Sequence, residues 1–190
     1  GILHFFVVPA IVDLAGLQDD GSDHTGSVHD EALALRDLFK FEFFFAEKGE
    51  FLAEVDAEVA ATDRPVTAPF LRPFLEAYWA TAEALAVHDD APVGAAALAD
   101  EACGLAEQFL LQARIYSADA VSSSYIDGAV RLAEHRGLLE GDLLEAELLD
   151  GGADFAARRA EFAHELHTWV RRVRVMQARA AARFLELMRS

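Results

Sequence analysis

The 190-residue sequence predicts an all-α protein, a bundle of about six to seven helices with a long helix at its C-terminal end. Alanine, leucine and glutamate dominate, and these residue types favour helices. The 5 prolines and 12 glycines that would interrupt helices are few and clustered. With 53% hydrophobic and 26% charged residues, the composition is that of a folded chain and not of a disordered one.

The first two helices follow from apolar runs and a capping signal. Residues 1–17 are apolar except for His4 and Asp13, which predicts a buried helix. A loop over 19–26 follows, and Ser27, with an acidic partner three residues later, then predicts the start of a second helix.

That second helix is expected to reach about Lys48, where Gly49 would end it. It contains the stretch LFKFEFFF, Leu38 to Phe45, which holds five phenylalanines. The alternation F-K-F-E-F has the period of a strand. Strong helix formers on both sides, without turn residues between, favour a helix instead. Its rings would then point all round the axis, so we expect neighbours to enclose the helix, and we expect Lys40 and Glu42 to find partners or to reach outward.

The middle of the chain predicts three more helices. One spans about 50–61, and the segment TDRPVTAP at 62–69 is the clearest linker, which weakly divides the chain into 1–62 and 70–190. Helices over about 70–87 and 95–114 follow, the first with prolines tolerated near its first turn.

Two more segments precede the C-terminal end. Ser117 predicts the start of another helix, which Gly137 ends. The segment 138–152 is ambiguous and is compatible with a short helix.

The last predicted helix, about 153–188, is the longest. Apolar residues recur along it at steps of seven, three and four, which is close to a heptad pattern. We expect this seam to lie across several helices or to pair with another chain. The seam consists of Phe155, Phe162, Leu166, Trp169, Val173, Met176, Ala180, Phe184 and Leu187.

The net charge of −17 is unevenly distributed. Residues 1–150 carry 8 basic and 29 acidic side chains, a net charge of −21, whereas residues 151–190 carry 8 basic and 4 acidic ones, a net charge of +4. An acidic body repels phosphates, so nucleic-acid binding is disfavoured. The C-terminal arginines leave two interpretations open. They pair with the acidic body, or they form a basic flank around Arg171, Arg172 and Arg174 that meets an anionic lipid surface.

Several classes of protein are excluded. The apolar, charge-free run 5–12 is far shorter than the roughly 18 residues of a membrane-spanning helix, so the chain is not expected to cross a membrane by itself. The single Cys103 excludes a disulfide framework and indicates, loosely, a reducing compartment. Because the chain begins at Gly1 without a methionine, we expect a processed piece or a fragment.

We predict no catalytic, cofactor-binding or metal-binding residue. His24 and His29 flank a loop with two aspartates, but solvated loop histidines are the simpler interpretation. Glu161 and His164 have the spacing of di-iron carboxylate bundles, yet the sequence holds no second Glu-x-x-His. Cys103 has no basic neighbour that would lower its pKa, and the serines at 122–124 have no activating histidine nearby.

Three segments in succession carry a family resemblance. They are ILHFFVVPAIVDLA, LRDLFKFEFFF and RIYSADAVSSSYIDGAVRLAEHRGLL. In order and spacing, over essentially the whole chain, they resemble the C-terminal region of bacterial glycerol-3-phosphate 1-O-acyltransferases. The matching positions are Ile2, His4, Pro9, Leu38, Lys40, Glu42, Phe43, Phe44, Leu132, Gly137, Leu138 and Leu139.

The resemblance implies a specific chemistry. Such enzymes transfer a fatty acyl group from acyl-CoA or acyl carrier protein to the 1-hydroxyl of sn-glycerol 3-phosphate, which makes lysophosphatidate for phospholipid synthesis. It also implies a location at the cytoplasmic face of the bacterial inner membrane. Their catalytic motif is His-x-x-x-x-Asp, with the histidine as general base and the aspartate as its orienting partner.

This chain lacks that motif. The residues at the aspartate position after its seven histidines are Pro9, His29, Ala34, Val93, Glu140, Trp169 and Arg172. We therefore expect a catalytic part upstream of Gly1 and no acyl transfer by this chain alone. The aromatic stretch would then dock the chain to its catalytic neighbour, or line an acyl channel, or enter the bilayer. The alternative from another class is an autonomous helical module that binds a ligand or a protein between its helices.

Overall fold

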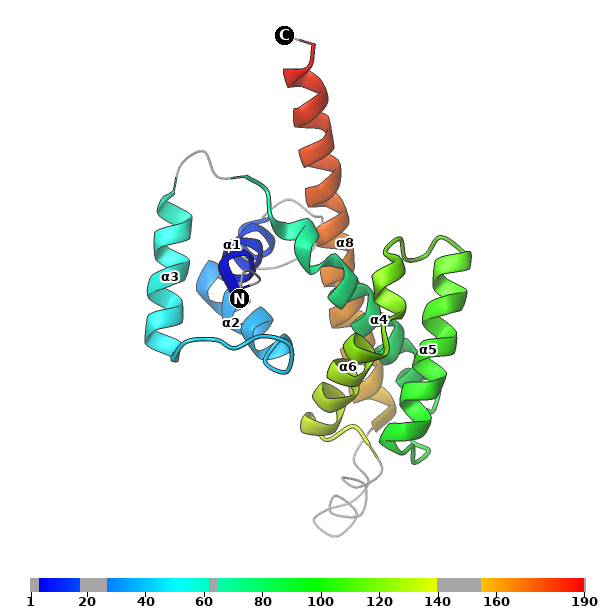
Figure 1. Ribbon diagram of the computed structural model, residues 1–190. Coiled ribbons are helices and arrows are strands. Elements are labelled where there is room, and N and C mark those ends of the chain that lie inside the picture. The colour runs from blue at the N-terminus through cyan, green and yellow to red at the C-terminus, as the bar shows by residue number, and fades with distance from the viewer. Residues whose placement is uncertain (1–3, 18–26, 62–64, 140–154, 190) are drawn as a thin grey trace. The chain divides into compact units, whose positions relative to one another are not determined.

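The computed structural model describes residues 4–17, 27–61, 65–139 and 155–189 (Figure 1). Within these ranges the chain forms seven α-helices and two short 3-10 helices, and no strand. This confirms the predicted all-α class and the long C-terminal helix. The predicted loop 19–26 and the ambiguous segment 138–152 lie wholly or mostly outside the described residues.

The chain divides into two compact units. Unit 1 comprises residues 1–72 and 171–190, and unit 2 comprises residues 73–170. The predicted division at the linker 62–69 stays a prediction, since part of the linker is not described.

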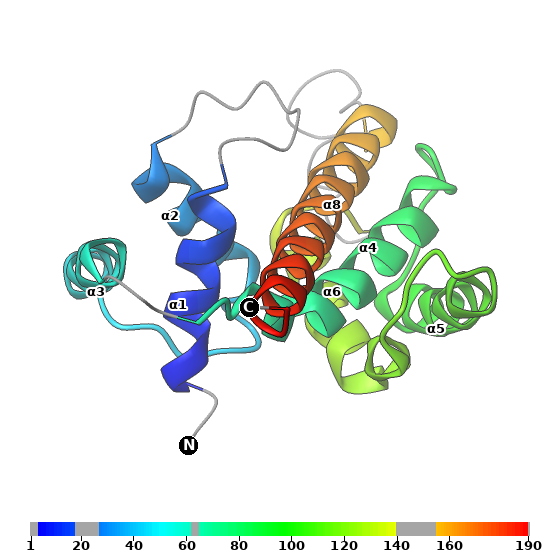
Figure 2. The same ribbon diagram turned by 90° about the horizontal axis from the view of Figure 1, so that it is seen from above.

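Unit 1 is organised around helix α1, His4–Ala15. Helices α2, Val28–Leu38, and α3, Lys48–Ala60, pack against it, as Figure 2 shows, and so does the 3-10 helix η1, Ala68–Leu71. Ile11 and Leu14 are completely buried, which confirms the buried first helix.

Helix α2 begins where the sequence predicts. The Ser27 hydroxyl accepts a hydrogen bond from the Asp30 backbone N–H at 3.2 Å and donates one to the Asp30 carboxylate at 2.8 Å. The cap therefore satisfies one of the free N–H groups in the first turn of the helix.

The predicted end of this helix at Lys48 is wrong. The helix ends at Leu38, the chain turns over residues 39–43, and Gly49 lies in the first turn of α3 instead of ending α2. A helix through the five phenylalanines would need apolar neighbours on every side. The turn avoids this requirement, because it buries Phe39 completely and leaves Phe44 87% exposed.

An aspartate of α1 holds the start of η1. Asp13, which is buried, accepts hydrogen bonds from the Thr67 backbone N–H at 2.5 Å, the Thr67 hydroxyl at 3.0 Å and the Ala68 N–H at 2.9 Å. The carboxylate thus caps a helix that is distant in sequence. The predicted helix over about 70–87 is confirmed, as η1 followed by α4, Arg72–Ala86.

Helix α4 forms the core of unit 2, and nearly all of its side chains from Phe74 to Leu85 are buried. Its neighbours are α5, Ala95–Leu111, and α6, Ser123–His135. The Trp79 ring lies 5.0 Å from the Phe109 ring of α5, and the Phe74 ring lies 4.2 Å from the Tyr125 ring of α6.

The start of α6 differs from the prediction. Ser117 opens a separate 3-10 helix, η2, Ala118–Val121, and α6 begins only at Ser123. The reason is the fully buried Glu76 of α4, whose carboxylate accepts hydrogen bonds from the Tyr116 and Ser117 backbone N–H groups at 3.0 and 2.9 Å. The predicted end at Gly137 is confirmed by its positive φ of 66°.

Helix α8, Phe155–Leu187, contributes 33 residues and passes from unit 2 into unit 1. Its predicted seam is buried from Phe155 to Val173. Beyond that point the seam is not buried in this chain, because Phe184 is 62% exposed, and pairing of this part with another chain stays a prediction.

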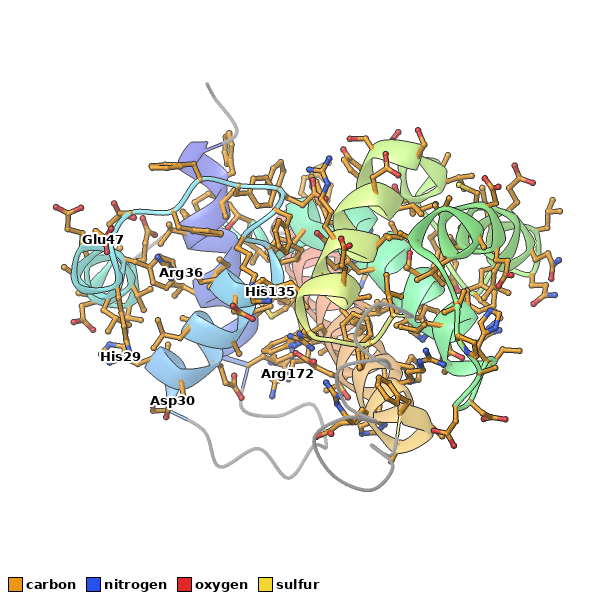
Figure 3. The ribbon with its side chains drawn as sticks, turned by 90° about the horizontal axis from the view of Figure 1, so that it is seen from below. His29, Asp30, Arg36, Glu47, His135 and Arg172 are labelled. Carbon is orange, nitrogen blue, oxygen red and sulfur yellow. The ribbon has the colours of Figure 1, made fainter. Side chains whose placement is uncertain are left out.

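The arginine that the sequence placed in the centre of a basic flank is not on the surface. Arg172, labelled in Figure 3, is 1% exposed, and its guanidinium contacts the Glu31 carboxylate of α2 at 2.7 and 3.1 Å. It also donates to the Leu14 carbonyl at 3.4 Å. For this residue the intramolecular pairing holds and the lipid interpretation is wrong.

Candidate functional site

The polar residues that the sequence analysis weighed do not assemble into a chemical site. Among the described residues, no group of three or more His, Cys, Asp or Glu could hold a metal ion. His29 pairs with Asp56 of α3 at 2.6 Å, whereas His24 lies outside the described part. Glu161 and His164 are both exposed on α8.

The buried carboxylates have structural roles. Asp13 and Glu76 accept hydrogen bonds from the backbone N–H groups of loops and 3-10 helices, and Glu31 binds the buried Arg172. Such contacts fix the ends of elements and satisfy charges that would otherwise be buried alone. These carboxylates therefore position the scaffold and show no arrangement for general base catalysis.

A buried arginine has a comparable role in unit 2. Arg159 is completely buried, and its guanidinium donates to the backbone carbonyls of Leu138, Asp89 and Ala91 at distances between 2.5 and 3.1 Å. Burial lowers its pKa, although the nearby Asp90 acts in the opposite direction. The side chain joins two backbone segments, the turn at Asp89–Ala91 and the chain at Leu138, to the start of α8.

Cys103 is also unsuited to nucleophilic catalysis. Burial raises the pKa of its thiol, and the nearby Asp100, Asp127 and Glu107 raise it further. Because the thiolate is the reactive form, a raised pKa disfavours this thiol as a nucleophile at neutral pH.

The most distinctive surface feature is an aromatic patch in unit 1, which we define as Phe6, Phe41, Phe43, Phe44, Phe45 and Phe70. Four of its rings, those of Phe6, Phe70, Phe43 and Phe45, form a connected series. Phe70 lies 6.2 Å from Phe6 and 6.1 Å from Phe43, and Phe43 lies 6.4 Å from Phe45, measured between ring centroids.

The buried rings Phe39 and Phe51 anchor this series in the core. Phe39 lies 5.9 Å from Phe43, and Phe51 lies 5.6 Å from Phe45, both in edge-to-face geometry. Edge-to-face pairs of this kind contribute about 0.5–1.5 kcal/mol beyond their buried area. The patch is therefore held in place by the core of unit 1.

Two cations, Arg36 of α2 and Lys40 of the turn itself, support the turn. The Arg36 guanidinium, labelled in Figure 3, donates to the Ala46 carbonyl at 2.9 Å and lies 5.9 and 5.6 Å from the Phe45 and Phe51 ring centroids. Lys40 pairs with Asp37 at 2.8 Å and lies 5.6 Å from the Phe41 ring.

A small open pocket of about 230 Å³ lies at the turn. The side chains of α2 provide its polar wall and the turn provides its rings. It is lined by Arg36, Asp37, Lys40, Phe43, Phe44 and Phe45. Ligand clefts for small molecules usually enclose about 300–1,000 Å³. The pocket is better suited to receiving one or two side chains of a docking partner than to enclosing a substrate.

Phe44 is the most exposed ring of the aromatic patch. The ring is 87% exposed although the residues on either side are half-buried, and Phe6 is 44% exposed as well. Phe44 lines the same pocket as the half-buried Phe43 and Phe45, so its exposed ring belongs to a larger apolar surface of the kind that marks interaction sites.

Sequence reasoning identified the aromatic stretch but not its shape. It placed Phe44 in a helix enclosed by neighbours, and it missed Arg36 and Phe70 as members of the site. The period-two alternation of F-K-F-E-F and the low helix propensity of phenylalanine were signals for a break at Leu38.

None of the helices in the described ranges has the length and apolarity to cross a bilayer.

Comparison with known proteins gives two related matches. The family described as "Glycerol-3-phosphate acyltransferase C-terminal region" matches residues 1–67 and 65–142. Proteins named "Putative acyltransferase plsB1" from Mycobacterium bovis and from two strains of Mycobacterium tuberculosis, CDC 1551 and H37Rv, are each 34% identical over 200 residues. The match covers 90% of this chain but only 31% of each relative, and no solved structure matches the chain.

Proposed function

Because the chain belongs to the family of glycerol-3-phosphate acyltransferase C-terminal regions, we propose that it is the helical C-terminal part of such an enzyme. The enzyme would transfer an acyl group from acyl-CoA or acyl carrier protein to the 1-hydroxyl of sn-glycerol 3-phosphate. The product, lysophosphatidate, would enter phospholipid synthesis. The acyltransferase relatives, which are about three times longer than the matched part, support a catalytic part elsewhere in the polypeptide.

One observation carries the non-catalytic role of this chain. None of its seven histidines is followed by an aspartate at the fifth position. The buried carboxylates that could orient a histidine instead cap backbone segments or bind arginine. We therefore infer that the chain acts as a scaffold and docking part of the enzyme.

The aromatic patch is the proposed docking surface for the catalytic part. The charges beside it cancel, since Arg36 and Lys40 are balanced by Asp37 and Glu42. A surface that is apolar and locally neutral suits a protein partner better than a phosphate-rich one, because interface centres are depleted in charge and enriched in aromatic residues. Burying Phe44 alone would contribute about 1.5–3 kcal/mol.

We further propose that the protein works peripherally at the cytoplasmic face of the bacterial inner membrane. The proposed product is a lipid, and the relatives are bacterial acyltransferases. The chemistry supports a site at which the product passes directly into a bilayer.

An autonomous ligand-binding module is the alternative, and the small pocket of about 230 Å³ is the observation nearest to it. That volume is below the usual range for enclosed small-molecule sites. The docking role accounts better for the exposed rings.

Acyl transfer tests the proposal. The full product of the gene and residues 1–190 alone are each incubated with sn-glycerol 3-phosphate and radiolabelled acyl-CoA, with acyl carrier protein as an alternative donor. We expect lysophosphatidate from the full product and only background from residues 1–190. Turnover by the 190-residue chain alone would contradict the assignment, and so would a full gene product that contains no His-x-x-x-x-Asp segment.

A further inference from the structure

The C-terminal end of α8 is the second exposed apolar surface of unit 1. The buried seam of the helix stops at Val173, and large side chains beyond it are exposed, namely Phe184 at 62%, Leu185 at 55% and Met188 at 72%. Figure 1 shows this end, drawn in red, running on beyond α1. An exposed cluster of this size at the end of a helix is a candidate interaction surface.

Four charged residues of the same segment lie on another face, whereas Arg174 falls within the arc of the apolar residues. At about 100° per residue, Arg171, Arg179, Glu186 and Arg189 fall within an arc of about 80°. The three exposed apolar residues fall within an arc of about 100° on nearly the opposite side of the helix. The segment is therefore amphipathic, with arginines on its polar face.

The charge of this helix end indicates which kind of partner its exposed surface binds. Residues 171–190 hold six arginines and one glutamate, a net charge of +5, in a chain whose net charge is −17. Arginines beside an apolar face are typical of helices that lie in the interface of an anionic bilayer. The aromatic patch at 36–45 is locally neutral, so it lacks this complementarity.

We propose that the C-terminal end of α8, residues 171–189, is an anionic-membrane-binding helix. Phe184, Leu185 and Met188 enter the boundary between headgroups and acyl chains, and the arginines meet the lipid phosphates. The acidic remainder of the chain is repelled by the same surface, so only this end of the helix makes contact. The buried Arg172, which is bound to Glu31, takes no part.

This inference gives the proposed peripheral location a physical basis, and its test requires no acyl transfer. Sedimentation of residues 1–190 with vesicles of phosphatidylcholine and phosphatidylglycerol is compared with sedimentation with phosphatidylcholine alone. We expect binding only to the anionic vesicles, and we expect it to weaken as salt is raised, because exposed charges are screened beyond about 8–10 Å at physiological ionic strength.

Two double variants separate the apolar and the charged contributions. Arg171→Gln with Arg189→Gln should weaken binding about 20- to 30-fold, since each basic residue contributes about fivefold at an anionic surface. Phe184→Ser with Leu185→Ser should weaken binding at least about tenfold. All four positions are exposed, so the melting temperature should stay nearly unchanged.

The matched control is Leu111→Ser with Arg131→Gln, which changes a leucine that is 88% exposed on α5 and an exposed arginine on α6. It should bind as the unchanged protein does. Equal binding by all variants would overturn the proposal. Absence of binding to anionic vesicles would do the same, as would self-association that the serine variant abolishes, since the last result assigns the surface to a second copy of the chain.

Discussion

The aromatic turn gives the clearest quantitative contrast in the structure. Phe39 and Phe44 lie five residues apart and have the same side chain, yet Phe39 is fully buried and Phe44 is 87% exposed. Phe39→Ala leaves a cavity between α2 and the rest of unit 1, and truncations of this kind cost about 3–5 kcal/mol. Phe44→Ala removes a solvent-exposed ring and should change the stability by no more than about 0.5 kcal/mol.

Urea unfolding measures the difference in stability between the Phe39→Ala and Phe44→Ala variants, provided that the spectroscopic probe reports on unit 1. Both tryptophans, Trp79 and Trp169, lie in unit 2, so their fluorescence does not report on unit 1. Unfolding of unit 1 is followed instead by far-UV circular dichroism combined with hydrogen exchange of the α1 and α2 amides. With a slope of roughly 2–3 kcal/mol per molar urea, Phe39→Ala should lower the midpoint by roughly 1–2 M.

The same measurement gives the refuting result. If Phe44→Ala lowered the midpoint as much as Phe39→Ala, the stretch would continue α2 as an enclosed helix, and the turn over 39–43 would be wrong. If neither variant moved the midpoint, the ring series would contribute nothing to the core.

Three further predictions concern buried polar groups. Arg172→Met should cost about 3–5 kcal/mol in unfolding free energy because it leaves Glu31 buried without its partner, and adding Glu31→Gln should recover part of that loss; no recovery would refute the pairing. Asp13→Ala should cost about 1–3 kcal/mol and speed hydrogen exchange at Ala68, whose N–H loses its acceptor; unchanged exchange there would count against the cap. Cys103 should react slowly with iodoacetamide at neutral pH and faster only well above its ordinary pKa, because burial and neighbouring carboxylates raise that pKa; a rate at neutral pH like that of a free thiol would contradict this.

Much of the fold is predictable from local signals. The N-cap at Ser27, the stop at Gly137 and the apolar seam of α8 as far as Val173 each depend on residues close in sequence, and the structure confirms them. The family resemblance rested on similarly local stretches such as LFKFEFFF.

The errors arise where distant residues decide the local structure. α2 ends at Leu38 because turning there buries Phe39 and lets Arg36 hold the returning chain by the Ala46 carbonyl. The helix that Ser117 was expected to begin is split because Glu76, 41 residues away, binds the Ser117 N–H. Glu76 lies outside the segment concerned, and the contact between Arg36 and Ala46 joins two residues of the predicted helix that only a turn brings together.

The candidate site could likewise be predicted only in part from the sequence. Composition and spacing identified the rings and the arginines, but exposure separates their roles. Phe44 is on the surface and Phe39 in the core, and Arg172 is buried while Arg171 is exposed. Such differences between neighbouring residues follow from packing in three dimensions, so hydrophobic pattern alone does not resolve them.

The central claim is that this chain docks to a catalytic part through its aromatic patch. Isothermal titration of residues 1–190 with the separately expressed upstream part of the gene product tests it most directly. We predict a complex that Phe44→Ser weakens about 10- to 100-fold, the loss expected for one buried ring, and that the exposed control Leu111→Ser leaves unchanged. Equal affinity of the Phe44→Ser variant and the unchanged chain, or no complex at all, would contradict the account.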